Sequence, residues 1–401
     1  MDNEKVIIIG GGMAGLSLAL FLKKAGITAV VYEAYPEFKN SGLAFTIAPN
    51  GMNVMNELGL AEEIIRGGNV ISAYQFRNAK GKPIVRMRTG PVEKYGQPAV
   101  LLSRFVLHSL LYKTAAENGI EVNYNKKLIA ITEDKHRVTA HFADGTQTEG
   151  TLLIGADGIH SATRLLTFPD APKPAYVGFY GTGGLLNING VDNGEKLCRE
   201  DLTLVYGSGG FFGYGFDKAD ELLWWSSLAV PEDEVKQFIT TATDGKIREI
   251  LLNIFKDYHS PVPELIGKTK KFAQTISYEL GELGKWHKGR VLLIGDAGHA
   301  LSTTSGQGAS MAFEDAILLA KLLRDNTLTN YEEAFCRFEK ERRPRLQKFR
   351  EAAKKGNSDK KVSSAFGLFV MEKMMKFFIG IFGENGLKWQ YGYKIHWRNK
   401  N

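Results

Sequence analysis

A strand–turn–helix–strand pattern at residues 5–33 restricts the fold more than any other feature of the chain. Residues 5–9 have the sequence KVIII, a short apolar run typical of a buried parallel strand. The glycine-rich segment GGGMAG follows at 10–15, and residues 16–25 have the apolar spacing of a helix. Residues 28–32 form a second apolar run. This order predicts a βαβ unit, the start of a Rossmann-like α/β domain.

The glycines of this unit predict a dinucleotide site. Gly10, Gly12 and Gly15 match the pattern GxGxxG, and Glu33 follows Gly15 by 18 positions. Glycines let the backbone approach a pyrophosphate, and the free N–H groups of the helix N-terminus attract that anion. An acidic residue at the end of the second strand can accept hydrogen bonds from a ribose. The predicted cofactor-binding residues here are Gly10, Gly12, Met13, Ala14, Gly15 and Glu33, and the pattern alone leaves FAD and NAD open.

Two later segments repeat the arrangement of a buried strand followed by an aspartate in a glycine-rich turn. The first is GADGIHSATR at 155–164, which contains Asp157. The second begins GDAGH at 295–299, with Asp296, and continues to SGQGA at 305–309. Each turn suits a backbone that passes close to a ligand. A tight turn capped by Asp157, and an ordinary strand–loop–helix connection after Asp296, are the alternatives.

Composition and charge exclude several classes of protein. A length of 401 residues predicts two or three structural units. The two cysteines, Cys198 and Cys336, lie far apart, which argues against a zinc site or a disulfide framework and fits a reducing, cytoplasmic compartment. No signal peptide precedes the first strand, and three charges interrupt the apolar stretch 362–382, so we expect no integral membrane segment.

The net charge of +7 is concentrated near the C-terminus. Residues 337–361 contain eleven basic and four acidic side chains. Two interpretations are open: a patch for an acidic partner or an anionic membrane surface, and a solvated helix face, which charge patterning favours. No stacking aromatic residues are interleaved, so nucleic-acid binding is not expected.

Residues 175–280 alternate apolar and polar side chains, with many glycines and aromatics, and predict a largely antiparallel sheet. Strand alternation places Phe212 and Tyr214 on one face and Phe211 on the other, and separates Trp224 from Trp225. Because an aromatic-lined pocket suits a planar substrate, one face is expected to bind a ligand. The candidate pocket residues are Phe212, Tyr214, Trp224 and Thr303.

The predicted domains are discontinuous. A cofactor-binding domain comprises 1–72, 98–172 and 285–335, and an inserted substrate-binding sheet domain comprises 73–97 and 173–284. The remaining residues, 336–401, form a C-terminal helical region.

Taken together, the three motifs resemble those of the group A FAD-dependent monooxygenases, the p-hydroxybenzoate hydroxylase-like family. GGGMAG with Glu33, GADGIHSATR and GDAGHALSTTSGQGASMAFEDA occur in the family's order, and Arg104-x-x-Leu107 also matches. The resemblance implies FAD as the cofactor. Beyond the first motif, it implies contacts to the cofactor from Arg104, Asp157, Asp296, Gly306, Gln307 and Gly308. The family commonly has a proline in the loop after the third-motif histidine, whereas this chain has none at 301–304.

The resemblance also implies an activity. NADPH or NADH reduces the flavin, O2 adds to give a C4a-hydroperoxyflavin, and a small aromatic or hydrophobic substrate is hydroxylated. No catalytic side chain and no metal are assigned. A flavin-dependent reductase or oxidase of the same fold, and a non-catalytic flavoprotein that sequesters a hydrophobic ligand, remain alternatives. Substrate-stimulated oxidation of NAD(P)H separates the enzymes from the binding protein.

Overall fold

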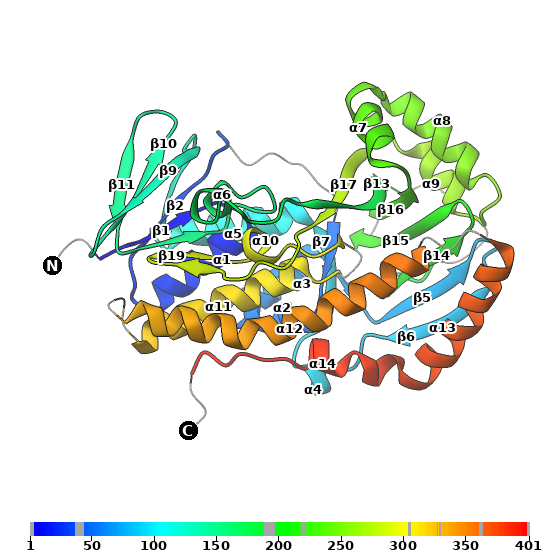
Figure 1. Cartoon of the computed structure of the whole chain (residues 1–401). Helices are drawn as coiled ribbons and strands as arrows, with labels where there is room; N and C mark the ends of the chain where they lie inside the picture. The colour runs from blue at the N-terminus through cyan, green and yellow to red at the C-terminus, as the bar shows by residue number, and fades with distance from the viewer. Residues whose placement is uncertain are drawn as a thin grey trace.

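Two large sheets and a set of C-terminal helices organise the chain in the computed structural model (Figure 1). The structure describes residues 4–36, 44–187, 197–218, 221–303, 306–326, 328, 330–360 and 364–398. The predicted α/β fold, with a βαβ unit, a mostly antiparallel second sheet and a helical C-terminal region, is confirmed.

The first sheet has six strands in the order β18-β19-β12-β1-β2-β8. In chain order these are β1 (Val6–Ile9), β2 (Ala29–Tyr32), β8 (Glu121–Asn123), β12 (Leu152–Gly155), β18 (His287–Lys288) and β19 (Val291–Leu293). β1 pairs in parallel with both β2 and β12, so the first two motifs begin at the same edge of the sheet. β12 pairs in parallel with β19, which adds the third motif to that edge.

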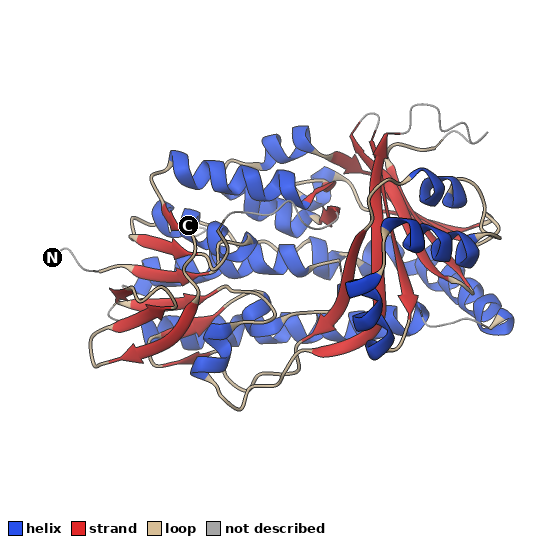
Figure 2. Ribbon diagram, turned by 90° about the horizontal axis from the view of Figure 1, so that it is seen from above, coloured by secondary structure: helices blue, strands red, loops and turns tan. Residues whose placement is uncertain are grey.

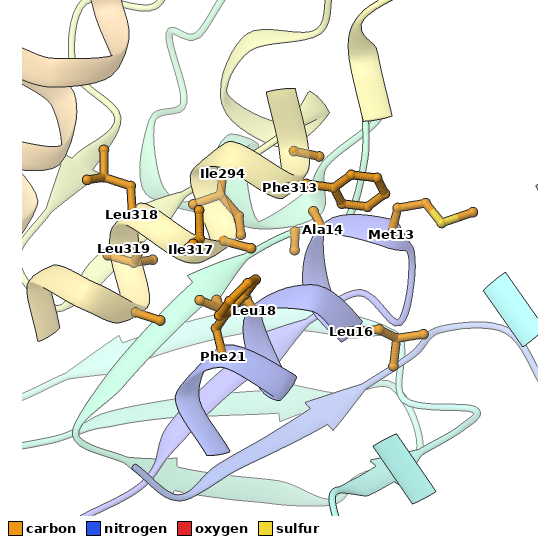
Figure 3. Close-up of a cluster of buried hydrophobic side chains, with 14 of the residues drawn as sticks. Met13, Ala14, Leu16, Leu18, Phe21, Ile294, Phe313, Ile317, Leu318 and Leu319 are labelled. Atoms are coloured by element: carbon orange, nitrogen blue, oxygen red, sulfur yellow. The ribbon is translucent and has the colours of Figure 1, made fainter. Parts of the chain in front are cut away.

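Both faces of this sheet are covered. On one face, α1 (Met13–Lys24) packs against α11 (Gly308–Asn326), with Leu18 and Phe21 facing Ile317 in the core (Figure 3). On the other face lies a small antiparallel sheet of β9 (Leu128–Glu133), β10 (Val138–Phe142) and β11 (Gln147–Gly150). Asp144-Gly145, a dipeptide typical of tight hairpin turns, connects β10 and β11. Two-sided burial explains why β1 and β12 are apolar throughout.

The second sheet lies at the end of the molecule away from the N-terminus (Figure 2). Its seven strands have the order β17-β13-β16-β15-β14-β5-β6. They are β5 (Ala73–Asn78), β6 (Pro83–Arg88), β13 (Ala175–Asn187), β14 (Asp201–Gly207), β15 (Gly210–Lys218), β16 (Glu221–Ala229) and β17 (Ala273–Glu279). All neighbouring pairs are antiparallel except β5 with β14. Its outer face is covered by α7 (Glu232–Thr241), α8 (Asp244–Phe255) and α9 (Val262–Lys268).

Shorter elements connect the two sheets. β3 (Ala44–Ile47), β7 (Ala99–Ser103) and β4 (Asn69–Ile71) form a three-stranded sheet in that order. Leu101 of β7 packs against Leu202 and Leu223 of the second sheet. The remaining helices before the C-terminal region are α2 (Pro49–Glu57), α3 (Ala61–Gly67), α4 (Val92–Tyr95), α5 (Arg104–Glu117), α6 (Ala162–Thr167) and α10 (Asp296–His299). The proposed domain boundaries stay a prediction.

The C-terminal region consists of α12 (Tyr331–Lys360), α13 (Ala365–Gly386) and α14 (Lys388–Tyr391). α12 runs along α11 toward the second sheet, and α13 turns back beneath β6 (Figure 1). No helix in the described part of the chain is both long and apolar enough to cross a bilayer.

The basic segment of α12 is only partly the solvated face that charge patterning favoured: Arg337, Lys340 and Lys348 are exposed, but other arginines are not. Arg342 and Arg345 are buried, at 0% and 7% exposure. Arg342 pairs with Glu314 at 2.6 Å and with Asp315 at 2.7 Å, and Arg345 pairs with Glu314 at 2.7 Å. Arg343 donates to the carbonyls of Leu283 and Gly284. Arg342 and Arg345 therefore join α12 to the acids of α11, and Arg343 joins α12 to the loop before β18.

Removing Arg342 should destabilise the protein strongly. Arg342→Ala removes the buried cation that Glu314 and Asp315 share, which costs about 3–5 kcal/mol in the free energy of unfolding. Arg337→Ala, in the same helix, removes an exposed pair with Glu341 and should cost less than about 1 kcal/mol. Urea unfolding followed by circular dichroism measures both. Equal losses for the two variants would show that the buried cluster contributes no special stability.

Candidate active site

The glycines of the first motif close a tight turn between β1 and α1. Gly10 has φ of +107°, and a Cβ there would lie 2.5 Å from the carbonyl oxygen of Ala156. A Cβ at Gly15 would overlap the carbonyl oxygen of Gly10. Gly12 differs, because a Cβ at that position would meet no protein atom within 4 Å. Gly12 is also the N-cap of α1 and offers no capping side chain. The first turn of α1, with Met13 and Ala14, thus presents backbone N–H groups beside open space, which suits a pyrophosphate.

Glu33 holds this turn in shape. Its carboxylate accepts the N–H of Gly11 at 2.7 Å and the N–H of Tyr35 at 3.0 Å. The other side of the turn is fixed by His108 of α5, whose Nε2 donates to the carbonyl of Gly11 at 2.8 Å. Burial lowers the pKa of His108, so the ring is neutral and acts as a donor through Nε2. The contact of Glu33 with a ribose stays a prediction.

Asp157 caps the turn of the second motif. Its carboxylate accepts the hydroxyl of Ser161 at 2.5 Å and both the N–H and the hydroxyl of Thr163, at 2.9 and 3.0 Å. This is the capping alternative raised from the sequence. The half-buried Asp157 follows Ala156, whose carbonyl lies against Gly10 of the first motif. A direct contact of Asp157 with a nucleotide stays a prediction.

Arg164 links the second motif to the third, a role that sequence reasoning did not assign. The side chain is only 1% exposed. It donates to the carbonyl of Ala297 at 2.8 Å and to that of Ile159 at 2.6 Å. The sequence signal for this role was the position of Arg164 as the last residue of the second motif.

The third motif adopts a turn that depends on Asp315. Gly295 has φ of +57°, and its N–H donates to Asp315 at 2.8 Å. The same carboxylate oxygen binds Nε2 of His299 at 2.6 Å, so His299 has a structural partner. A Cβ at Gly295 would lie 3.1 Å from the Cβ of Ala14, which brings the third motif against the first. All three motifs therefore meet at one edge of the six-stranded sheet.

Asp296 and Arg104 lie close enough for the charge of Arg104 to lower the pKa of Asp296. The Asp296 side chain is exposed to solvent, yet protein groups crowd it, and the resulting desolvation raises its pKa. His299 and Arg104 oppose this rise by favouring the charged carboxylate. Arg104 begins α5 and is itself exposed. Both positions are thus accessible to a cofactor at this edge, and their contacts with it stay predictions.

The flavin-loop residues lie at the start of α11. Gly306 has φ of +59°, and Cβ atoms at Gly306 and Gly308 would meet no protein atom within 4 Å. Gln307 is buried and accepts a hydrogen bond from Asn50 of α2 at 3.1 Å. Thr303 is exposed, and its hydroxyl lies 3.1 Å from that of Ser277 on β17. The open space around these glycines fits a bound ring system, while residues 304 and 305 lie outside the described part of the chain.

Three of the predicted pocket residues require a correction. Phe212, Tyr214 and Trp224 are 0–4% exposed and pack against α8 and α9, on the sheet face that points away from the three motifs. Phe212 stacks on Trp224, with ring centroids 5.0 Å apart. The alternation was predicted correctly, but these side chains belong to the core. Trp225 lies on the opposite face, in the cluster that contacts β7.

That opposite face carries a row of aromatic rings. Phe76, Tyr206, Phe211 and Trp225 come from four adjacent strands, β5, β14, β15 and β16. Their ring centroids are separated by 6.4, 5.1 and 6.4 Å in that order. We call these four side chains the aromatic row; Tyr206 and Trp225 are half-buried, and Phe76 and Phe211 are buried beside them. Sequence alternation had placed Phe211 opposite Phe212, and Trp225 opposite Trp224. Only the packing of α8 and α9 shows which of the two faces is buried in the core.

Comparison with known proteins identifies the family. A family model described as an FAD binding domain matches residues 3–353. The chain belongs to this FAD-binding family. It is 31% identical to a 3-amino-4-hydroxybenzoate 2-monooxygenase from Streptomyces platensis, over 86% of both chains. It is 29% identical to an FAD-dependent urate hydroxylase from Klebsiella pneumoniae, over 86% of this chain and 87% of the relative.

A solved structure agrees with this assignment. The complex of Klebsiella pneumoniae HpxO with FAD and uric acid superposes with a TM-score of 0.84 at 25% sequence identity. The match covers 96% of this chain and 95% of HpxO. The predicted class, an FAD-dependent monooxygenase, is confirmed. NAD(P)H and O2 are the co-substrates of that class.

The open space at Gly12 predicts a selective loss of cofactor. Gly12→Ala should fold normally, since φ at this position is −81° and no protein atom is near. Its methyl group would occupy the space next to the helix N-terminus and should weaken FAD binding at least about tenfold. Gly267→Ala, in α9, also meets open space and should leave FAD affinity unchanged. Fluorescence titration of apoprotein with FAD measures this difference, and unchanged affinity of Gly12→Ala would remove the pyrophosphate assignment.

Asp315 should make stability depend on pH. Burial alone would raise its pKa, but His299 and Arg342, together with the hydrogen bonds to His299 and Gly295, hold it at about 2. An unfolded aspartate has a pKa of about 3.9, so the unfolded state binds more protons and stability falls as the pH drops from about 5 toward 2. Asp315→Asn should be less stable at pH 7 and should show a shallower fall between pH 5 and 3. Urea unfolding across that range tests this; parallel curves for both proteins would contradict it.

Proposed function

We propose that the enzyme hydroxylates an uncharged, planar aromatic substrate that lies against the aromatic row. The aromatic row supports this proposal most directly. Phe76, Tyr206, Phe211 and Trp225 lie on the sheet face that meets the cofactor-binding part of the chain through Leu101. Aromatic rings in offset or edge-to-face contact recognise a planar ring system through dispersion and quadrupole interactions.

The charge of this face supports an uncharged substrate. The neighbours of the aromatic row on the same face include Tyr74, Leu204, Gly213 and Gly183, as the strand pairing places them. Among the described side chains that this pairing places on the face of β5, β6 and β13–β17, none is Lys, Arg or His. A carboxylate substrate would need a cation or several N–H donors there. The relatives named above act on hydroxybenzoate and urate, and the substrate proposed here differs from those in charge.

The residues of the site have distinct tasks in this reaction. FAD, once bound and reduced by NAD(P)H, supplies the activation of O2 and the transfer of one oxygen atom. The protein holds the cofactor at the glycines and the first turn of α1, and the row orients the substrate ring. Leu101, Leu202 and Leu223 close the contact between the sheets with apolar side chains and help to exclude water. We assign no proton-transferring side chain.

The cellular location is part of the proposal. Both cysteines, Cys198 and Cys336, are free and exposed. This fits a reducing compartment and supports the expected cytoplasmic location.

A matched pair of compounds tests the substrate class. We expect 4-hydroxyquinoline to accelerate NAD(P)H oxidation and gain one oxygen atom by mass spectrometry, whereas its 2-carboxylate should be at least about tenfold weaker in kcat/KM, because the carboxylate finds no cation on the sheet face. Urate and 3-amino-4-hydroxybenzoate serve as anionic comparisons. Preference for the anionic compounds would overturn the proposed class. Oxidation without oxygen transfer to any compound would favour the reductase or oxidase alternative.

A paired substitution tests the aromatic row itself. Trp225→Ala should raise KM at least about tenfold for the active compound, since it removes a large ring contact. FAD affinity should stay unchanged. Trp224→Phe alters the adjacent residue on the core face and should leave KM unchanged. The same KM for wild type and Trp225→Ala would contradict the assignment of this face.

A further inference from the structure

Helix α13 exposes a continuous apolar face. Its exposed large side chains range from Val370 at 38% to Phe366 at 78% exposure. The full set is Phe366, Phe369, Val370, Met374, Phe377, Phe378, Ile381 and Phe382. A contiguous surface of this size and composition is unusual for an isolated soluble domain and marks an interaction site.

The exposure does not result from loose attachment of the helix. The opposite side of α13 packs on β6, with Met371 buried. Glu372 accepts a hydrogen bond from Asn78 at the end of β5, at 3.2 Å. A Cβ at Gly383 would lie 3.1 Å from the side chain of Met87 on β6, so helix and strand are in close contact. The apolar face is therefore held outward by a docked inner face.

The exposed charges of α13 beside this face are mainly positive. Lys373 and Lys376 are exposed on the helix, and the two acids of α13 point elsewhere: Glu372 binds Asn78, and Glu384 pairs with Lys94. The end of α12 adds the exposed Lys354 and Lys355. The amino group of Lys355 lies 5.7 Å from the ring centroid of Phe378, which places this end of α12 beside the apolar face.

We propose that the outer face of α13, together with Lys354 and Lys355, docks onto a bilayer surface that contains anionic phospholipids. An apolar stripe rich in phenylalanine and flanked by lysines is the composition of a helix that lies in the interfacial plane of a membrane. The phenylalanines enter the boundary between headgroups and acyl chains, and the lysines contact lipid phosphates. The association is peripheral, since none of the described helices meets the requirement for a membrane span.

Charge distinguishes this occupant from a second copy of the chain. A two-fold contact between identical α13 faces would bring lysines toward lysines, because an isologous interface uses the same patch twice. Among the described residues of this face there is no acid to compensate. An anionic lipid surface satisfies both the apolar and the cationic parts of the face.

Co-sedimentation of the FAD-loaded enzyme with vesicles tests the proposal. We expect binding to vesicles of phosphatidylcholine mixed with phosphatidylglycerol, weaker binding to phosphatidylcholine alone, and loss of the difference in high salt. The variant Phe377→Ser/Ile381→Ser should reduce the partition coefficient at least about tenfold. Lys373→Gln and Lys376→Gln should each reduce it about fivefold for the anionic vesicles.

Matched controls use equally exposed residues away from α13. Ile129→Ser/Leu166→Ser and Lys270→Gln/Lys271→Gln should bind vesicles as the wild type does. Absence of binding to anionic vesicles, or equal losses in these controls, would overturn the proposal. So would sedimentation velocity showing a dimer that Phe377→Ser/Ile381→Ser dissociates, without any vesicle binding. Turnover of a soluble substrate should be unchanged in all these variants, so failure of the docking proposal is distinguishable from failure of the proposed hydroxylation.

Discussion

A buried cluster of two acids and two arginines holds the cofactor-binding edge together. Glu314 and Asp315 lie next to each other on α11, and Arg342 and Arg345 reach them from α12. All four side chains are at most 7% exposed. Burying such charges costs several kcal/mol for each ion, and only close pairing with full hydrogen bonding offsets that cost. The remaining donors of Arg345 also find partners, because they donate to the carbonyls of residues 389 and 390.

The same cluster reaches the loops of the site. Asp315 holds Gly295 and His299, while Glu314 accepts a hydrogen bond from Asn50, which also binds Gln307. The third motif therefore takes its shape from acids of α11, which Arg342 and Arg345 of α12 hold in place.

Local sequence patterns predicted the parts of the structure that depend on local chemistry. The apolar run before GGGMAG, the helix after it and the buried strands before Asp157 and Asp296 all follow from spacing and turn preferences. The choice between the two faces of the second sheet could not be made this way. Alternation separates Trp224 from Trp225, but α8 and α9, about 20 to 40 residues later, decide which of them is core. The same limit explains Arg342: a run of basic residues has the same composition whether it faces water or the acids of another helix.

The acids of the first and second motifs stabilise backbone turns. Glu33 and Asp157 were predicted as ligands of a nucleotide, and each proves to bind backbone N–H groups of its own region. Asp315, in the third motif, does the same at Gly295. In each motif a carboxylate therefore fixes a backbone turn, and in the first two motifs one glycine of the turn, Gly12 or Gly158, is left with open space beside it. Because the protein itself forms these bonds, the turns are organised before a cofactor arrives, and less of the binding free energy is spent on ordering them. The motif acids thus preorganise the site even where they do not touch the ligand.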